Sequence, residues 1–214
     1  MHIITTHRKI YTMQLQKEKF NKFEIPTLYN IISLLPKSTN VLALLRDLCT
    51  PPELRILRER LTIALYLQHK PNFSYKMIKN LTGSSVTTIM KVNHVLQNKI
   101  CNGYKTILPQ CNIYTSLEEA LLKTGTAERC KDLISDLCTT YEINIFETRL
   151  VVAYLLSKGS SNKEIINFIS VSTATLTRIR RFLNYENNRG YTAAFHLFDK
   201  YNCDNNTAML KFKI

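Results

Sequence analysis

The sequence predicts an all-α protein composed of two tandem helix-turn-helix domains. Three observations lead to this prediction. Apolar residues recur at the spacing of an α-helix, glycine and proline are scarce, at 5 and 6 of 214 residues, and one half of the chain resembles the other. Sheet proteins connect many short strands through turns rich in glycine and proline, so the scarcity of both favours helices.

An internal repeat organises the chain. The residues Asp-Leu-Cys-Thr at 47–50 recur at 136–139, and the match continues position by position through 53–64. After a loop that is two residues longer in the first copy, it resumes and holds through the Gly-Tyr pair at 103–104. An apolar register that survives one loop-sized gap is typical of two copies of one fold. We therefore expect a basic N-terminal extension at 1–24, a first domain at 25–108, a second domain at 113–201 and a C-terminal tail at 202–214.

The longest helix expected in each copy carries an apolar stripe. The stripe falls at i, i+3, i+7, i+10 and i+11 in both copies, which places it on one face of a helix. Thr50 and Thr139 stand directly before these helices, where a threonine oxygen accepts a hydrogen bond from the first turn. The stripes are Leu54, Leu57, Leu61, Ala64 and Leu65 in copy one and Ile143, Phe146, Leu150, Ala153 and Tyr154 in copy two.

Two short helices joined by a tight turn follow in each copy. Copy one has a helix at 74–81 and a second helix after Ser85. Copy two has a helix at 161–168, a turn at 169–171 and a second helix after Ser172. Such a unit places its second helix in the major groove of DNA. The residues expected to face inward from the second helices are Val86, Ile89, Val92 and Leu96 in copy one and Leu176, Ile179 and Leu183 in copy two.

The outer side of both second helices suits a DNA groove. It must be small, polar or cationic, because acidic side chains would repel phosphates, and neither helix contains an acidic residue. Lysines on the preceding helices stand where contacts with the phosphates of the DNA backbone are expected. The candidate DNA-binding residues are Lys76, Lys79, Ser85, Thr87, Thr88, Met90 and Lys91 in copy one and Lys163, Ser172, Thr173, Ala174, Thr175, Thr177, Arg178, Arg180 and Arg181 in copy two.

This set of motifs resembles the Trp repressor family. The resemblance rests on the Leu-Cys-Thr-Pro sequence at 48–51, on Arg60 and Arg149, and on the Ser-Thr-Ala-Thr-Leu-Thr-Arg sequence at 172–178. It covers nearly the whole chain from Ile25, once per copy. It implies Trp-repressor-like all-helical domains, an intertwined dimer whose recognition helices enter successive major grooves, and transcriptional repression.

The best-known members of that family need bound tryptophan as corepressor. The resemblance implies a ligand pocket at Thr50, Arg60, Thr88 and Lys91 in copy one and at Thr139, Arg149, Thr175 and Arg178 in copy two. The tryptophan-binding members have glycine after the recognition-helix arginine, where this chain has Val92 and Ile179. β-branched side chains fill that space, and Lys91 lacks the planar fork with which arginine binds a carboxylate. We therefore expect no cofactor, a vestigial pocket, and Arg60 and Arg149 in structural ion pairs.

The charge of the chain favours an anionic partner. With 29 Lys+Arg against 16 Asp+Glu, the formal net charge is +13, and double-stranded DNA fits both the charge and the helix-turn-helix units. Since the family acts as a two-fold dimer, we expect the copies to be intertwined as a pseudo-dimer within one chain, with homodimerisation of chains as the alternative. Unlike recognition helices then predict a repressor-like transcriptional regulator that reads two unlike half-sites about 34 Å apart.

Other classes of function find less support in the sequence. The chain has no nucleophile motif, no glycine-rich phosphate loop and no zinc-ligand spacing among its 6 cysteines, which argues against an enzyme or a metal protein. No apolar run approaches the roughly 20 residues that span a bilayer, so we expect a cytoplasmic, nucleoid-associated protein. The alternatives left open are a helical protein-interaction or assembly module without DNA recognition and an RNA-binding or transposase-type helix-turn-helix. The extension at 1–24 is either an arm that lies along DNA or a tail without a role.

Overall fold

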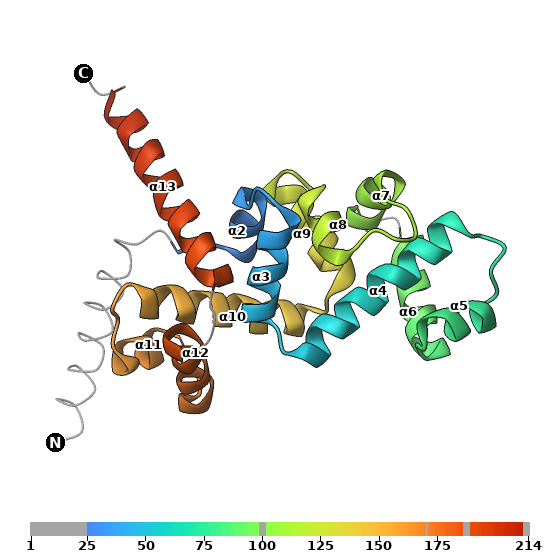
Figure 1. The fold of residues 1–214 in the computed structure, drawn as a ribbon, viewed down its shortest axis with the longest axis horizontal. Helices are drawn as coiled ribbons and strands as arrows, with labels where there is room; N and C mark the ends of the chain where they lie inside the picture. The colour runs from blue at the N-terminus through green and yellow to red at the C-terminus, as the bar shows by residue number, and fades with distance from the viewer. Residues whose placement is uncertain (1–24, 99–101, 170, 186–188, 212–214) are drawn as a thin grey trace, which may run out of the picture.

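The computed structural model describes residues 25–98, 102–169, 171–185 and 189–211, which form helices and their connections without a single strand (Figure 1). The predicted all-α class is therefore confirmed for these residues. The predicted extension at 1–24 and Ser170, in the predicted turn of copy two, lie outside the described residues.

The helices occur in the same order in both copies. Copy one comprises α2 (Leu28–Leu34), α3 (Ser38–Leu48), α4 (Pro51–His69), α5 (Tyr75–Thr82), α6 (Val86–Gln97), α7 (Gly103–Ile107) and the 3-10 helix η1 (Leu108–Gln110). Copy two comprises α8 (Leu117–Leu122), α9 (Ala127–Leu137), α10 (Thr140–Ser157), α11 (Asn162–Phe168), α12 (Thr173–Tyr185) and α13 (Arg189–Lys211).

The matched helices α4 and α10 begin with the same capping box. The Thr50 hydroxyl accepts from the Glu53 N–H at 3.4 Å, and the Glu53 carboxylate accepts from the Thr50 N–H at 2.6 Å. In copy two the corresponding distances between Thr139 and Glu142 are 3.2 and 2.7 Å. These bonds satisfy backbone donors that the first turn of a helix leaves unpaired. The predicted helix starts are confirmed.

The apolar stripes of α4 and α10 enter one continuous core. The five stripe residues of copy one are buried, as are four of copy two, and Ile143 packs against them partly buried. Side chains from both copies surround a small apolar cavity of about 20 Å³ in this core. Its lining consists of six residues and their six repeat counterparts, namely Leu28 and Leu117, Ile32 and Leu121, Leu45 and Ile134, Leu48 and Leu137, Cys49 and Cys138, and Leu57 and Phe146.

Helices of one copy pack against helices of the other in matched pairs. Helix α7 lies on α9 and α13 lies on α3, while α2 contacts α9 and α8 contacts α3. A Cβ atom at Gly103 would clash with the backbone of Leu133, and one at Gly190 would clash with the backbone of Ala43. The two helix pairs therefore approach more closely than any side chain at these glycines would permit.

Two aspartates fasten the same helix pairs. Asp136 accepts a hydrogen bond from the Tyr104 N–H at 2.8 Å, and Asp47 accepts one from the Tyr191 N–H at 2.9 Å. Both donors lie in the first turn of their helices, where backbone N–H groups lack partners within the helix. The aspartate of each Asp-Leu-Cys-Thr motif therefore binds the tyrosine N–H of the Gly-Tyr motif in the other copy, and the chain makes this contact twice.

The structure corrects the sequence-based prediction at α6. Val86 was expected to face inward, but its side chain is 39% exposed. Val86 is the first residue of α6, so it precedes the turn that packs against α4.

The second difference concerns the end of copy two. The boundary expected at 201 falls inside α13, which continues to Lys211.

Candidate nucleic-acid interface

The helix-turn-helix unit of copy one consists of α5 and α6. Ser74 caps α5 by accepting from the Met77 N–H at 3.2 Å. Gly83 ends α5 in the left-handed conformation, with φ of 71°, which glycine adopts without steric cost. Ser85 then caps α6 by accepting from the Thr88 N–H at 3.0 Å. This sequence of cap, left-handed glycine and cap fixes the turn between the helices.

The unit of copy two, α11 and α12, reaches the same arrangement without a glycine. Ser161 and Glu164 form a capping box at the start of α11, with distances of 2.8 and 3.3 Å. Ser172 caps α12 by accepting from the Thr175 N–H at 3.1 Å. Its hydroxyl lies 2.9 Å from the Thr175 hydroxyl, as Ser85 lies 2.9 Å from Thr88 in copy one. The two recognition helices therefore begin with the same local geometry.

The residues predicted to contact DNA are accessible in both units. All of them are exposed except Thr88 and Thr175, which are partly buried and whose hydroxyls contact those of their capping serines. Figure 1 shows α5–α6 and α11–α12 at opposite ends of the long axis, both on the lower side of α4 and α10. The chain thus presents two separate exposed helices from one side of a common core.

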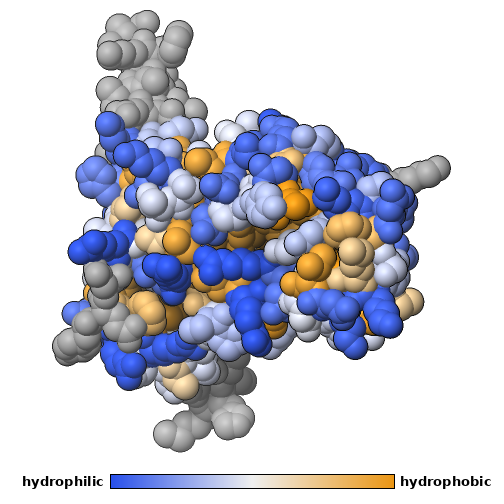
Figure 2. Space-filling model, turned by 45° about the vertical axis from the view of Figure 1, so that its right-hand side comes forward, coloured by the Kyte–Doolittle hydropathy of each residue, from blue (hydrophilic) through white to orange (hydrophobic). Residues whose placement is uncertain are grey.

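The two units differ in charge. Along α6, Lys91 is the single lysine or arginine, whereas α12 carries Arg178, Arg180 and Arg181. The Arg180 guanidinium donates to the Asn162 side-chain oxygen at 2.6 Å, which ties the recognition helix to the start of α11. Figure 2 shows that hydrophilic side chains cover most of one face of the molecule, with hydrophobic patches between them. The cationic charge of the recognition helices is concentrated in copy two.

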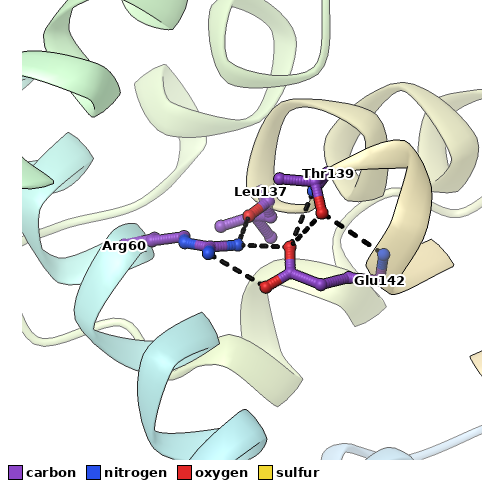
Figure 3. A network of polar contacts seen from close by, with 4 residues as sticks. All are labelled: Arg60, Leu137, Thr139 and Glu142. Atoms are coloured by element: carbon purple, nitrogen blue, oxygen red, sulfur yellow. Dashed lines mark hydrogen bonds and ion pairs between the residues drawn. The ribbon is translucent and has the colours of Figure 1, made fainter. Parts of the chain in front are cut away.

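Arg60 and Arg149 form reciprocal ion pairs between the copies, as expected from the sequence. Arg60 donates to both oxygens of Glu142, at 2.8 and 3.0 Å, and to the Leu137 carbonyl at 2.8 Å (Figure 3). Glu142 belongs to the capping box of α10 and Leu137 is the last residue of α9, so Arg60 binds the junction of these two helices in the other copy.

The matching arginine of copy two repeats this contact. Arg149 donates to Glu53 at 2.7 and 2.9 Å and to the Leu48 carbonyl at 3.0 Å. Burial raises the pKa of the Glu53 carboxyl, but hydrogen bonds from Arg149 and Thr50 outweigh burial and lower that pKa to about 2. The pKa of Glu142 is lowered by the same balance, with Arg60 and Thr139 as donors.

In copy two, the positions at which the resemblance implies a ligand pocket enclose little space. Arg149, Thr175 and Arg178 line a cavity of about 70 Å³, together with Ile179 and Tyr191. Small-molecule pockets usually measure about 300–1,000 Å³. Ile179, which occupies the position of the family glycine, is only 5% exposed, and so is its copy-one counterpart Val92.

The residues that hold the copies together were not identified from the sequence. The repeat matches Glu53 with Glu142 and Gly103 with Gly190, but repetition alone does not assign these residues a contact. The repeat itself could have indicated them. A glutamate or a glycine that recurs in both copies is not explained by the apolar core, so its recurrence indicates another structural role. The reason is contact with the other copy.

Neither a metal centre nor a membrane-spanning helix is found in the part of the chain that the structure describes. No group of three or more potential metal ligands occurs there. None of its helices is both long and apolar enough to cross a membrane. Cys49, Cys111 and Cys130 are buried free thiols, and burial raises the pKa of Cys49 and of Cys130 to about 12.

Comparison with known proteins identifies the family. The family model described as Trp repressor protein matches the chain twice, at residues 24–112 and 113–197. The chain is 38% identical over 71 residues to the uncharacterized protein YerC of Bacillus subtilis (strain 168), a match that covers 33% of this chain and 68% of that protein. No solved structure matches the chain. The Trp repressor family consists of helix-turn-helix DNA-binding regulators, not enzymes. The chain therefore belongs to the Trp repressor family and carries the family domain twice in tandem.

Proposed function

We propose that this protein is a sequence-specific transcriptional regulator, repressor-like in action, that binds double-stranded DNA through α6 and α12 and reads two unlike half-sites. The observation that carries the proposal is the presence, in one chain, of two capped and exposed recognition helices with different outer residues. Copy one offers Thr87, Met90 and Lys91 at positions where copy two offers Ala174, Thr177 and Arg178. Because different side chains favour different base edges, the two half-sites differ.

The reading surfaces have the charge that phosphate contact needs. Neither α6 nor α12 contains an acidic residue, and Lys76, Lys79 and Lys163 are exposed on the helices that precede them. Contacts of this kind set the position of a protein on DNA, while base contacts from the recognition helix give specificity. A nucleoid-associated location follows from such binding.

The two copies act together as a single-chain pseudo-dimer. Three reciprocal contacts support this part of the proposal: the Arg60 and Arg149 ion pairs, the Gly103 and Gly190 helix crossings, and the aspartate bonds to Tyr104 and Tyr191. Each contact joins one copy to the other, as a subunit interface joins the halves of a two-fold dimer. A monomeric chain then suffices for one operator.

Binding is independent of tryptophan. Ile179 and Val92 take up space at the ligand position, and the copy-two cavity of about 70 Å³ is small for an amino acid with an indole ring. In addition, Arg60 and Arg149 already direct both terminal guanidinium nitrogens to a carboxylate of the protein. Adding tryptophan at millimolar concentration should leave DNA affinity unchanged.

The direct test is a salt titration of DNA binding by the full chain, measured by fluorescence anisotropy with labelled random-sequence duplex. We expect a dissociation constant that rises steeply with salt, and competition by duplex DNA that exceeds competition by duplex RNA. The control is the variant Lys200→Ala, since Lys200 is exposed on α13, outside both helix-turn-helix units; it should bind as the wild type does.

Two results would overturn the proposal. Absence of salt-dependent binding would favour the helical interaction module, and preference for RNA would favour an RNA-binding helix-turn-helix.

A further inference from the structure

A groove of about 790 Å³ runs along the outer side of α4. Its lining comes from α3, α4 and the end of α5 in copy one and from α12 in copy two. Arg178, on the copy-two recognition helix, and Leu81, at the end of the first helix of the copy-one unit, both line it. The groove therefore touches both DNA-reading units.

The charged lining of the groove is mostly cationic. Four arginines, Arg46, Arg55, Arg58 and Arg178, stand against one acidic residue, Glu59. Arg55 pairs with Glu59 at 3.7 Å, and Arg58 pairs with Glu118 at 3.5 Å. Among the described residues Arg46 and Arg178 take part in no ion pair, and both are exposed. The groove thus has cationic groups available for an anion.

The remainder of the lining is largely apolar. Cys49 and Leu54 lie at its base, 5% and 7% exposed, while Leu81 is 53% exposed beside them. Phe182 contributes an aromatic ring from α12. A DNA backbone has little apolar surface to place against these groups, whereas a small molecule with an apolar body gains by covering them. The volume also lies within the range of small-molecule sites.

The repeat provides an internal comparison. The copy-two counterparts of Arg46, Arg55 and Arg58 are Ser135, Asn144 and Glu147, and the counterpart of Arg178 is Lys91. The corresponding surface therefore lacks the excess of cations. The two copies therefore differ in charge on their outer surface. They do not differ in the ion pairs between them, since Arg60–Glu142 has its counterpart in Arg149–Glu53.

We infer that the groove along α4 binds a small apolar carboxylate that carries no ammonium group, since the arginines that line the groove repel a second cation. It binds once per chain, and its occupancy weakens DNA binding. The carboxylate lies against Arg46 and Arg178, and the exposed Arg55 adds positive charge beside them. The apolar body covers Leu54, Leu81 and Phe182. The site is separate from the cavity of about 70 Å³ at the family's ligand position, although Arg178 borders both.

The effect on DNA follows from the position of Arg178, and this step rests on the proposed function. A carboxylate paired with Arg178 cancels one positive charge on the recognition helix, so fewer counterions are released when DNA binds. The ligand is therefore an inducer that lowers the affinity for DNA.

Ligand binding is tested without DNA, using 8-anilinonaphthalene-1-sulfonate as a fluorescent anionic probe of the full chain. We expect one probe per chain, displacement by 1-naphthoate, and no displacement by the uncharged 1-naphthylmethanol at the same concentration. The double variant Arg46→Gln and Arg55→Gln should bind the probe about tenfold more weakly. The control Lys131→Gln, which removes an exposed cation on α9, should bind it unchanged. Equal displacement by both naphthalene compounds, or equal binding by the double variant, overturns the site.

A second arm tests the coupling to DNA. Saturating 1-naphthoate should raise the dissociation constant of wild-type protein for DNA about tenfold and leave that of the double variant unchanged. If 1-naphthoate binds and DNA affinity does not move, the coupling is wrong while the site stands. If the double variant alone shows weaker DNA binding and a shallower salt dependence, the groove contacts phosphates and the small-molecule assignment is wrong. Failure of all DNA binding contradicts the proposed function and leaves the probe experiment intact.

Discussion

Helices α6 and α12 begin alike and then diverge. Each is capped by a serine whose hydroxyl accepts a hydrogen bond from the N–H of a threonine three residues later. Further along, α12 carries three arginines, whereas α6 carries one lysine. The interior shows the opposite pattern. The Arg60 and Arg149 ion pairs have N–O distances of 2.8 and 2.7 Å, and every residue around the central cavity has its repeat counterpart there.

The difference separates two kinds of constraint. Residues between the copies must satisfy each other in a packed space, so a change on one side demands a change on the other. Residues on the exposed sides of α6 and α12 do not pack against the other copy, so one can change without a matching change elsewhere in the protein. A chain that carries both copies is also free of the symmetry that identical subunits impose. Under the proposed function, each surface can therefore adapt to its own half of the operator.

The largest expected effect is on DNA affinity. Replacing Arg178, Arg180 and Arg181 with alanine should weaken binding about a thousandfold near 0.1 M salt, at about tenfold per lost phosphate contact, and flatten the salt dependence. Replacing Lys76, Lys79 and Lys91 should cost about tenfold in total, the loss of one phosphate contact, because only Lys91 stands on the recognition helix itself. Anisotropy titrations at several salt concentrations measure both. Equal or reversed losses would show that copy two is not the stronger phosphate binder.

The next effect concerns the helix crossing between the copies. Gly190→Ala should lower the free energy of unfolding by about 3 kcal/mol, since the added Cβ would meet the backbone of α3 and force the helices apart. Gly103→Ala should do the same at α9. Urea denaturation measures both, with the exposed Lys200→Ala as control. A loss below about 0.5 kcal/mol at either glycine would mean that the close approach is not maintained in solution.

The ion pairs between the copies should have equal effects. Arg60→Met and Arg149→Met should each reduce the free energy of unfolding by about 2 kcal/mol, because each leaves a half-buried glutamate without its bidentate partner. Double-mutant cycles with Glu142→Gln and Glu53→Gln isolate the pair energies. Coupling energies that differ by more than about 1 kcal/mol would contradict a symmetric interior.

The smallest effect is on acid stability. The pKa of Glu53 falls from 4.5 to about 2 on folding, so its contribution to stability is complete above pH 4.5 and is lost as pH falls toward 2. Glu53→Gln should therefore flatten the decline of unfolding free energy between pH 5 and 2. Glu128→Gln, at an exposed position on α9, serves as control. Parallel pH profiles for Glu53→Gln and the wild type would exclude the proposed role of this carboxylate.

The sequence predicted those features that depend on neighbours along the chain. Thr50, Thr139, Ser85 and Ser172 cap helices as their positions indicated, because a cap needs only the next three residues. The apolar stripes predicted the core for a similar reason. The exposed Val86 shows the limit of this pattern, since helical spacing does not reveal where packing begins.

Contacts between the copies could not be predicted in the same way. The sequence indicated that Arg60 and Arg149 form ion pairs, but it did not indicate that Glu142 and Glu53 of the opposite copy are the partners. Those pairings depend on how the copies meet, and the groove along α4 exists only because α12 of copy two lies beside α4 of copy one. Such features follow from tertiary packing and not from local pattern.

The most direct test of two unlike readers in one chain is selection of binding sites from random duplex DNA, followed by footprinting at the selected site. The account predicts two different half-sites, centred about one helical turn apart and occupied by one chain. Exchanging the α6 segment 87–91 for the α12 segment 174–178 should then convert the selected site to a palindrome. A palindromic site selected by the wild type, or one that needs two chains, would contradict the account.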